Sequence, residues 1–283
     1  MGKLRIFLEM IKFEHTIFAL PFAYLGAFLA ADGVPTLAQI VWITLAMVGA
    51  RTAAMSLNRL IDRHIDARNP RTSKRAIPAG LLGASEVYVY VVLSFLLLGI
   101  AAYQLNMLAL KLMPIAVFVL VLYSYTKRFT WLCHFVLGLA LGLAPAGAWI
   151  GITGHWALAP VLLGLGVLTW VAGFDIVYAC QDAEFDRKEG LYSIPSVFGI
   201  KRGMEVSTVL HVLAPMLFIA VGIVQGMSFL YFTGVAAAIF LLYRQHRIIS
   251  AEDLSKIGIA FFNLNGYLSV LLFVFSLLDL LLR

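Results

Sequence analysis

Polar residues at helical spacing close the second of several long apolar segments in the chain. Asn58, Asp62 and Asp66 stand at positions i, i+4 and i+8, so a helix would carry all three on one face. Arg51 lies deeper in the apolar segment, on nearly the same face. Ionisable side chains at such depth in a membrane are costly and usually functional. This first stripe therefore predicts a polar site at one end of a spanning helix.

A second stripe closes the sixth apolar segment. Asp175, Tyr178, Asp182 and Asp186 are spaced by 3, 4 and 4 residues, which again places them on one helical face. Four spans separate the two stripes, and because that number is even, both stripes emerge on the same side of the membrane. The two carboxylate faces can therefore converge at the mouth of one cavity.

The chemistry of these side chains favours Mg²⁺ as the cofactor. Mg²⁺ prefers hard oxygen ligands and binds through one or two carboxylates together with substrate phosphates. A Zn²⁺ site would require Cys or His at close spacing, which this sequence lacks. The alternative is that the acids pair with neighbouring arginines at the membrane surface, above all for Asp66, which has Arg59, Arg63 and Arg68 nearby.

Basic residues suited to a diphosphate follow both the first stripe and the fourth span. Arg can hold phosphate oxygens with two parallel hydrogen bonds, whereas Lys acts as a point charge. Taken singly, each could equally set membrane topology or contact lipid headgroups. The candidates are Arg68, Arg71, Lys74, Arg75, Lys127 and Arg128, of which we expect Arg71, Arg75 and Lys127 to bind diphosphate.

Composition and hydropathy indicate an all-α, polytopic membrane protein. Of 283 residues, 62% are hydrophobic and 13% charged, the mean hydropathy is +0.93, and soluble domains are far more charged. Apolar blocks of spanning length predict a single bundle of nine transmembrane helices, at 15–31, 37–57, 85–103, 107–125, 131–151, 158–178, 206–224, 228–243 and 257–280. Short connections predict a single domain over 1–283.

The two ends of the chain are expected on opposite sides of the membrane. Residues 2–15 alternate charge and bulk, which favours an amphipathic helix at the interface over a cleaved signal peptide. We expect the protein in the cell membrane, which is the inner membrane where a cell has two. Loops rich in Lys and Arg place the N-terminus and the cavity mouth on its cytoplasmic side, and Arg283 on the outside. The same bias explains most of the net charge of +6, so we expect no nucleic-acid partner.

Longer motifs extend this interpretation. N-R-L-I-D-R-H-I-D begins at Asn58 and is followed by R-x-x-x-R-x-x-P-x-G, and D-x-x-Y-x-x-x-D-x-x-x-D begins at Asp175. With these motifs the chain resembles the UbiA superfamily of intramembrane aromatic prenyltransferases over essentially its whole length. The resemblance implies nine transmembrane helices around a central cavity. It also implies Mg²⁺ and a polyprenyl diphosphate at the cytoplasmic mouth, with the prenyl tail running toward the lipid bilayer.

The resemblance also implies roles for the two stripes. It makes Asn58, Asp62, Asp182 and Asp186 the expected Mg²⁺ ligands, with Asp66 in support, and places these acids in the catalytic site. Asp175 and Tyr178 would lie deeper, beside the acceptor ring. Asp175 would position or deprotonate the acceptor, or else be a hydrogen-bonded core residue. Asn263 and Asn265 would line the mouth or, alternatively, join helices.

The acceptor stays open between two aromatic acids. The segment M-I-K-F-E-H-T-I-F-A-L-P-F-A looks like that of bacterial enzymes labelled 4-hydroxybenzoate polyprenyltransferase, which act in ubiquinone biosynthesis. Some similar enzymes are thought to prenylate a dicarboxylated naphthol in futalosine-route menaquinone biosynthesis. For either acid, Arg51 is the expected carboxylate-binding residue. The alternative from another class is a membrane transporter or lipid carrier, because intramembrane carboxylates also mark ion pathways.

Overall fold

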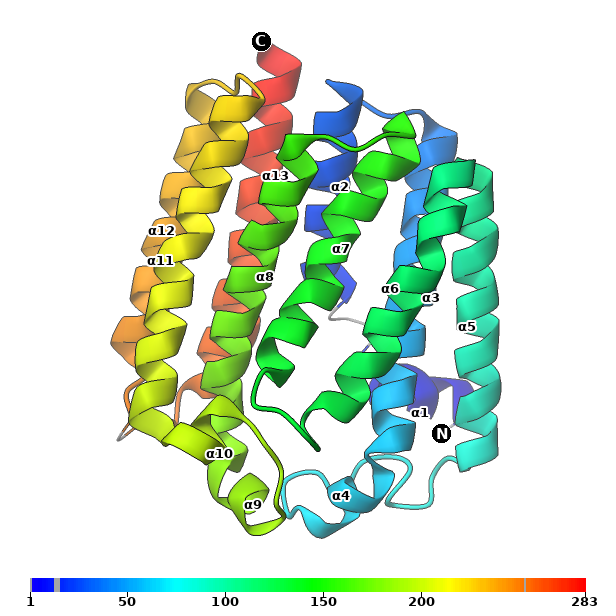
Figure 1. Cartoon of the computed structure of the whole chain (residues 1–283), viewed down its shortest axis with the longest axis vertical. Helices are drawn as coiled ribbons and strands as arrows, with labels where there is room; N and C mark the ends of the chain where they lie inside the picture. The colour runs from blue at the N-terminus through cyan, green and yellow to red at the C-terminus, as the bar shows by residue number, and fades with distance from the viewer. Residues whose placement is uncertain (1, 13–15, 252) are drawn as a thin grey trace.

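The computed structural model describes residues 2–12, 16–251 and 253–283, and within them every regular element is a helix. In this part of the chain, nine long helices run side by side along the molecule (Figure 1). They are α2 (Thr16–Ala31), α3 (Leu37–Ile61), α5 (Ala84–Leu105), α6 (Met107–Thr126), α7 (Cys133–Thr153), α8 (Leu158–Ala179), α11 (Ile200–Val224), α12 (Phe229–Ile248) and α13 (Asn265–Leu282). The prediction of an all-α bundle is confirmed.

The predicted count of nine membrane spans is not confirmed. Over the described part of the chain, seven helices are long and apolar enough to cross a membrane, and α2 is a shorter apolar helix. The remaining long helix, α12, ends in a turn that contains His246 and Arg247. Those polar residues lower the hydropathy that a spanning segment requires.

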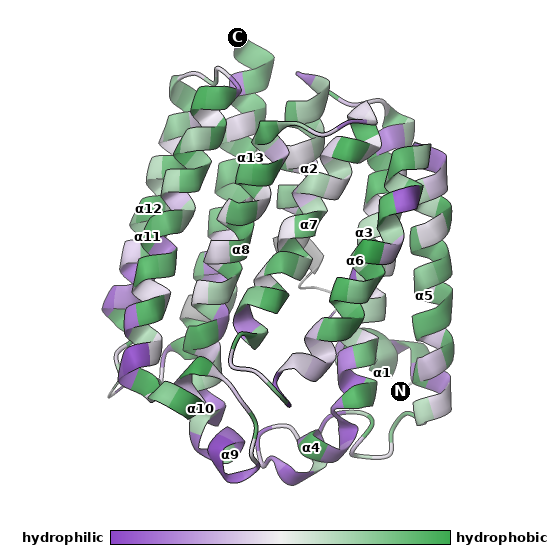
Figure 2. Ribbon diagram, in the orientation of Figure 1, coloured by the Kyte–Doolittle hydropathy of each residue, from purple (hydrophilic) through white to green (hydrophobic). Residues whose placement is uncertain are grey.

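Short helices gather at one end of the bundle. They are α1 (Lys3–Met10), α4 (Arg63–Arg68), the 3₁₀ turn Cys180–Asp182, α9 (Ala183–Lys188) and α10 (Ile194–Phe198). Figure 1 shows these helices at the lower end and the C-terminal end of α13 at the upper end. Hydrophilic residues concentrate on the lower end, whereas the long helices are largely hydrophobic (Figure 2). The polar site predicted from the two stripes therefore belongs to the lower end.

Helix α1 has the two faces expected of an interfacial helix. Phe7 and Met10 are buried against residues that include Leu82 and Val87, whereas Lys3 and Arg5 are exposed. The prediction of an amphipathic N-terminal segment is confirmed for α1, and residues 13–15 of that segment lie outside the described part of the chain.

Helices α7 and α8 approach each other closely through small residues. A Cβ added at Gly138 would lie 2.4 Å from the backbone oxygen of Leu168, and one at Gly142 would lie 2.5 Å from that of Gly164. Small residues four apart allow membrane helices to pack backbone against backbone. This contact fixes α8, which carries Asp175, against α7.

Candidate active site

A large cavity of about 970 Å³ lies within the bundle, and its lining extends to the short helices, where it includes Asp66, Phe185 and Asp186. The residues that the sequence favoured for the site line this cavity, whereas the further candidates Arg68, Arg128 and Asn263 do not. The favoured residues are Arg51, Asn58, Asp62, Asp66, Arg71, Arg75, Lys127, Asp175, Tyr178, Asp182 and Asp186. The expected convergence of the two stripes on one cavity is therefore present in the structure.

The first stripe keeps one face although its helix bends. Helix α3 ends at Ile61, Asp62 is its C-terminal cap, and α4 begins at Arg63. The Asp62 N–H still donates to the Asn58 carbonyl at 2.9 Å, and the Asp66 N–H donates to the Asp62 carbonyl at 2.8 Å. Because these four-residue hydrogen bonds persist across the bend, the three polar side chains remain aligned along the cavity wall.

Asp62 is the most heavily paired acid in the site. Its side chain is 3% exposed, and its two oxygens contact Lys127 Nζ at 2.9 Å and an Arg128 guanidinium nitrogen at 2.8 Å. The Asn58 amide also donates to Asp62, at 3.0 Å. A buried carboxylate requires such partners, and here two of them come from the turn after α6.

The loop after α4 supplies the cations for the other acids. Both Asp66 oxygens lie 2.8 Å from one Arg75 guanidinium nitrogen. The alternative that Asp66 pairs with an arginine therefore holds for Arg75, but not for two of the arginines nearer in sequence: Arg68 pairs with Glu189 at 2.7 Å, and Arg63 donates to a backbone carbonyl. The loop reverses direction after Arg68, which brings Arg75 over Asp66.

The same loop joins the two stripes. Arg71 donates through Nε to Asp182 Oδ1 at 2.9 Å, forms a second ion pair with Oδ2, and donates to the Tyr178 hydroxyl at 3.0 Å. The Asn69 amide donates to the same Asp182 oxygen at 3.0 Å. Burial lowers the pKa of Arg71, but the hydrogen bonds to Asp182 and Tyr178 and the charge of Asp182 together raise it more, so the pKa lies above its ordinary value. Arg71 therefore stays charged.

The carboxylates suit Mg²⁺ by donor type. The described residues contain no group of three or more His, Cys, Asp or Glu side chains placed to hold a metal ion. Carboxylates that contribute singly or in pairs fit Mg²⁺, because Mg²⁺ completes its shell with water and substrate oxygens. Asp186 lines the cavity and, among the residues that the structure describes, has no ion-pair partner.

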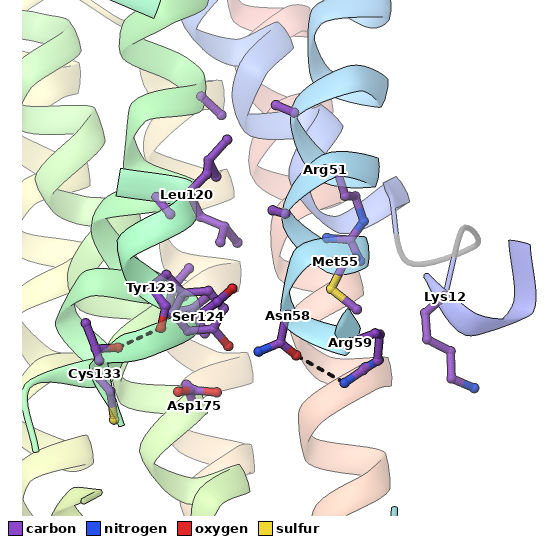
Figure 3. Close-up of a pocket in the computed structure, with 18 of the residues that line it drawn as sticks. Lys12, Arg51, Met55, Asn58, Arg59, Leu120, Tyr123, Ser124, Cys133 and Asp175 are labelled. Atoms are coloured by element: carbon purple, nitrogen blue, oxygen red, sulfur yellow. Dashed lines mark hydrogen bonds between the residues drawn. The ribbon is translucent and has the colours of Figure 1, made fainter. Parts of the chain in front are cut away.

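The inner part of the cavity contains a different set of groups. Figure 3 shows Arg51 and Asn58 on one wall, facing Tyr123, Ser124 and Asp175 on the other. The Nε atom of Arg51 is buried and has no hydrogen-bond partner within the described part of the chain. A guanidinium with an unused donor in a cavity is suited to bind an anion.

Several site residues lie outside the sequence prediction. His134 contacts Asp175 at 2.7 Å, and Arg59 lines the cavity beside Asn58. Asn69 precedes a proline in R-N-P-R, a turn signal that could have indicated its role. Of the two asparagines in the last span, Asn265 lines the cavity and accepts a hydrogen bond from Trp170 at 3.0 Å, whereas Asn263 is exposed.

The fold and the site together define a helical membrane protein with an internal cavity whose mouth holds paired acids and cations. Residues 19–267 match the model of the UbiA prenyltransferase family. The chain therefore belongs to the UbiA prenyltransferase family. This membership makes it a membrane prenyltransferase and favours the enzyme over a transporter or lipid carrier.

Curated relatives and solved structures agree with the family. The 4-hydroxybenzoate octaprenyltransferase of Aliivibrio fischeri (strain MJ11) is 32% identical over 252 residues, covering 87% of this chain and 85% of that protein. The protein of the same description from Photobacterium profundum is 27% identical over 278 residues, covering 97% of this chain and 96% of that protein.

Among solved structures, an apo UbiA homologue from Aeropyrum pernix K1 has a TM-score of 0.86 at 33% identity, covering 94% of this chain and 98% of that one. A UbiA homologue from Archaeoglobus fulgidus bound to GPP and Mg²⁺ has a TM-score of 0.71 at 21% identity, covering 94% and 99%. The second likeness concerns the fold alone.

Proposed function

We propose that this protein transfers a polyprenyl group from a polyprenyl diphosphate to an aromatic acid in quinone biosynthesis, in a Mg²⁺-dependent reaction, with 4-hydroxybenzoate as the first candidate acceptor. The observation that carries the proposal is the convergence of both acidic stripes and their cations on one cavity. The relatives described as 4-hydroxybenzoate octaprenyltransferases support this acceptor.

The diphosphate would bind at the mouth. Arg71, Arg75 and Lys127 now neutralise Asp182, Asp66 and Asp62 respectively. The carboxylates of Asp62, Asp66 and Asp182 would hold Mg²⁺, and the three cations beside them would then be free to face phosphate oxygens. The bound Mg²⁺ would supply positive charge to stabilise the departing diphosphate. The structure of the Archaeoglobus homologue with GPP and Mg²⁺ supports this pairing of ligands.

The prenyl chain and the reacting carbon would occupy the apolar body of the cavity. Its walls include Leu98, Leu112, Met113, Leu137 and Leu141. Such a lining excludes water, which would otherwise capture the allylic cation formed when the carbon–oxygen bond breaks. The membrane on the outside of the bundle accommodates chain length that the cavity does not.

The acceptor would lie in the inner part. Arg51, with its unused Nε donor, would bind the acceptor carboxylate, and Tyr178 would contact the ring. Asp175 is 21% exposed and would accept the proton that the ring loses after carbon–carbon bond formation. A base within hydrogen-bond reach of the acceptor contributes about 10²- to 10⁴-fold in rate.

A dicarboxylated naphthol is the second candidate acceptor. Arg59 lies two turns beyond Arg51 on the same cavity wall (Figure 3), and neither forms a salt bridge with a residue that the structure describes. Two guanidinium groups on one wall fit an acceptor with two carboxylates better than one with a single carboxylate. The position of Arg51 and Arg59 two turns apart on one wall is the observation that favours the naphthol of futalosine-route menaquinone biosynthesis.

We place the mouth and the N-terminus on the cytoplasmic side of the inner membrane, and we treat residues 1–283 as a single domain. The support is the clustering of hydrophilic residues at the end that carries α1, α4 and α9, opposite the C-terminus (Figure 2). This end carries Lys and Arg side chains, among them Arg63 and Arg68 of α4 and Lys188 of α9, and the positive-inside rule assigns an end rich in Lys and Arg to the cytoplasm. Cysteine labelling of exposed residues at the two ends, in intact cells and in inverted vesicles, tests the orientation.

Prenyl transfer by the purified protein tests the function. The protein in detergent is given a polyprenyl diphosphate with 4-hydroxybenzoate or the dicarboxylated naphthol, with Mg²⁺ or with EDTA, and the products are identified by mass spectrometry. A prenylated acid that forms only with Mg²⁺ is expected, and the preferred acceptor is the one with the higher kcat/KM. Folded protein that prenylates neither acid would refute the proposal.

A further inference from the structure

His134 is a buried histidine in direct contact with the proposed base. It is the second residue of α7 and is 2% exposed. Its Nδ1 atom lies 2.7 Å from Asp175 Oδ2, across the contact between α7 and α8. Both residues line the cavity, so the pair faces the region where the acceptor would lie.

A backbone group fixes the protonation state of this imidazole. The Ile194 N–H, at the start of α10, donates to His134 Nε2 at 3.2 Å. A backbone N–H can only donate, so Nε2 must present its lone pair. The proton of the neutral ring then lies on Nδ1, from which it is donated to Asp175. Protonating Nε2 as well would set two donors against each other.

The contact leaves one carboxylate oxygen of Asp175 for chemistry. Oδ2 accepts from His134, whereas Oδ1 has no hydrogen-bond partner among residues 2–12, 16–251 and 253–283. The neutral donor stabilises the charged carboxylate and restricts rotation of the side chain. Oδ1 is therefore held in one orientation, with the side chain partly open to the cavity.

We propose that His134 is a positioning residue that orients Asp175 as the base for the acceptor, an inference that rests on the proposed function. In this step a ring carbon of the acceptor bonds to the prenyl carbon, and the bond from that carbon to the diphosphate oxygen breaks with its electron pair on the diphosphate. The proton on the attacked ring carbon passes to Asp175 Oδ1, and its bonding electrons restore the aromatic ring. His134 keeps its proton throughout.

Two substitutions at His134 separate positioning from proton transfer. Glutamine presents one N–H donor for Asp175 and one carbonyl acceptor for the Ile194 N–H, but it does not titrate. Leucine presents neither. We expect His134→Leu to lower kcat about tenfold or more, a part of the roughly 10²- to 10⁴-fold that a general base contributes, with the KM for the diphosphate unchanged. His134→Gln should keep kcat within about threefold of the native value.

A double-mutant cycle with Asp175→Asn separates positioning from a purely structural role. If His134 acts through Asp175, adding His134→Leu to Asp175→Asn should change kcat less than about twofold, because interacting residues are not additive. A full further loss in the double variant would show that His134 only supports the fold. If His134→Leu does not fold, His134→Asn takes its place, because its shorter amide cannot reach both partners.

The failure of the positioning role and the failure of the proposed function give different results. A native kcat in His134→Leu, or a loss in His134→Gln as large as that in His134→Leu, would overturn the positioning role while the proposed function stands. Native protein that transfers no prenyl group to any aromatic acid would refute the proposed function and the positioning role with it.

Discussion

Replacing Arg51 should weaken binding of the acceptor and leave binding of the diphosphate nearly unchanged. Arg51 lies on the inner part of the α3 wall (Figure 3), away from the carboxylates at the mouth. Its buried Nε has no partner among the described residues, so no existing contact is broken when it binds a carboxylate. Hydrogen bonds to charged groups contribute about 1.5–3 kcal/mol. At about 1.4 kcal/mol per factor of ten, Arg51→Ala should raise the acceptor KM about 10- to 100-fold.

The assay varies each substrate at a saturating concentration of the other. Arg51→Lys, which keeps the charge but not the planar donor pair, should lie between the native protein and Arg51→Ala. Arg202→Ala is the matched control, because Arg202 is exposed on α11 and, within the described part of the chain, forms its ion pair with nearby Glu205, at 2.8 Å. Equal increases in both KM values for Arg51→Ala would refute the reasoning and assign Arg51 to the diphosphate.

Three further predictions concern packing, metal binding and the connecting loop. Gly142→Ala should lower the thermal unfolding temperature in detergent, because its Cβ would lie 2.5 Å from a backbone oxygen of α8 and overpacking costs about 1–3 kcal/mol. The control Gly147→Ala should leave that temperature unchanged, because no atom lies within 4 Å of its Cβ. Equal effects of the two substitutions would contradict the close approach of α7 to α8. Asp186→Asn should raise the Mg²⁺ concentration for half-maximal activity by about tenfold or more without lowering stability, whereas exposed Glu184→Gln should change neither. Asn69→Ala should raise the diphosphate KM about tenfold, because it removes a hydrogen bond to the Asp182 carboxylate worth about 1.5 kcal/mol. An unchanged KM, measured by varying the diphosphate, would show that Asn69 does not support diphosphate binding through Asp182.

The arrangement of the two stripes could be predicted because it depends only on helical spacing and on an even number of spans. Asn58, Asp62 and Asp66 stay aligned even though α3 ends at Ile61. The second stripe likewise crosses a 3₁₀ turn at 180–182 without losing its face. Local periodicity therefore determined which acids meet, and family motifs indicated what they bind.

The partners of these acids could not be predicted, because they depend on how an irregular loop folds back. The loop after α4 carries no periodicity, so nothing in the sequence indicates that Arg75 reaches Asp66 while Arg68 reaches Glu189. The contact between His134 and Asp175 joins residues 41 positions apart on two helices. Such contacts follow from helix packing, which depends on close approaches such as that of Gly142 to α8.

The most direct test of the account measures Mg²⁺-dependent prenyl transfer in variants of both stripes. The account predicts that native protein and Glu184→Gln form a prenylated aromatic acid with Mg²⁺ and none with EDTA. Asp62→Asn and Asp182→Asn, one from each stripe, should each lose about a hundredfold or more of kcat, since each removes a carboxylate that would hold the metal, and the metal would in turn hold the diphosphate. Near-native transfer by either variant, or transfer that continues in EDTA, would contradict the claim that the two stripes form one metal-dependent site.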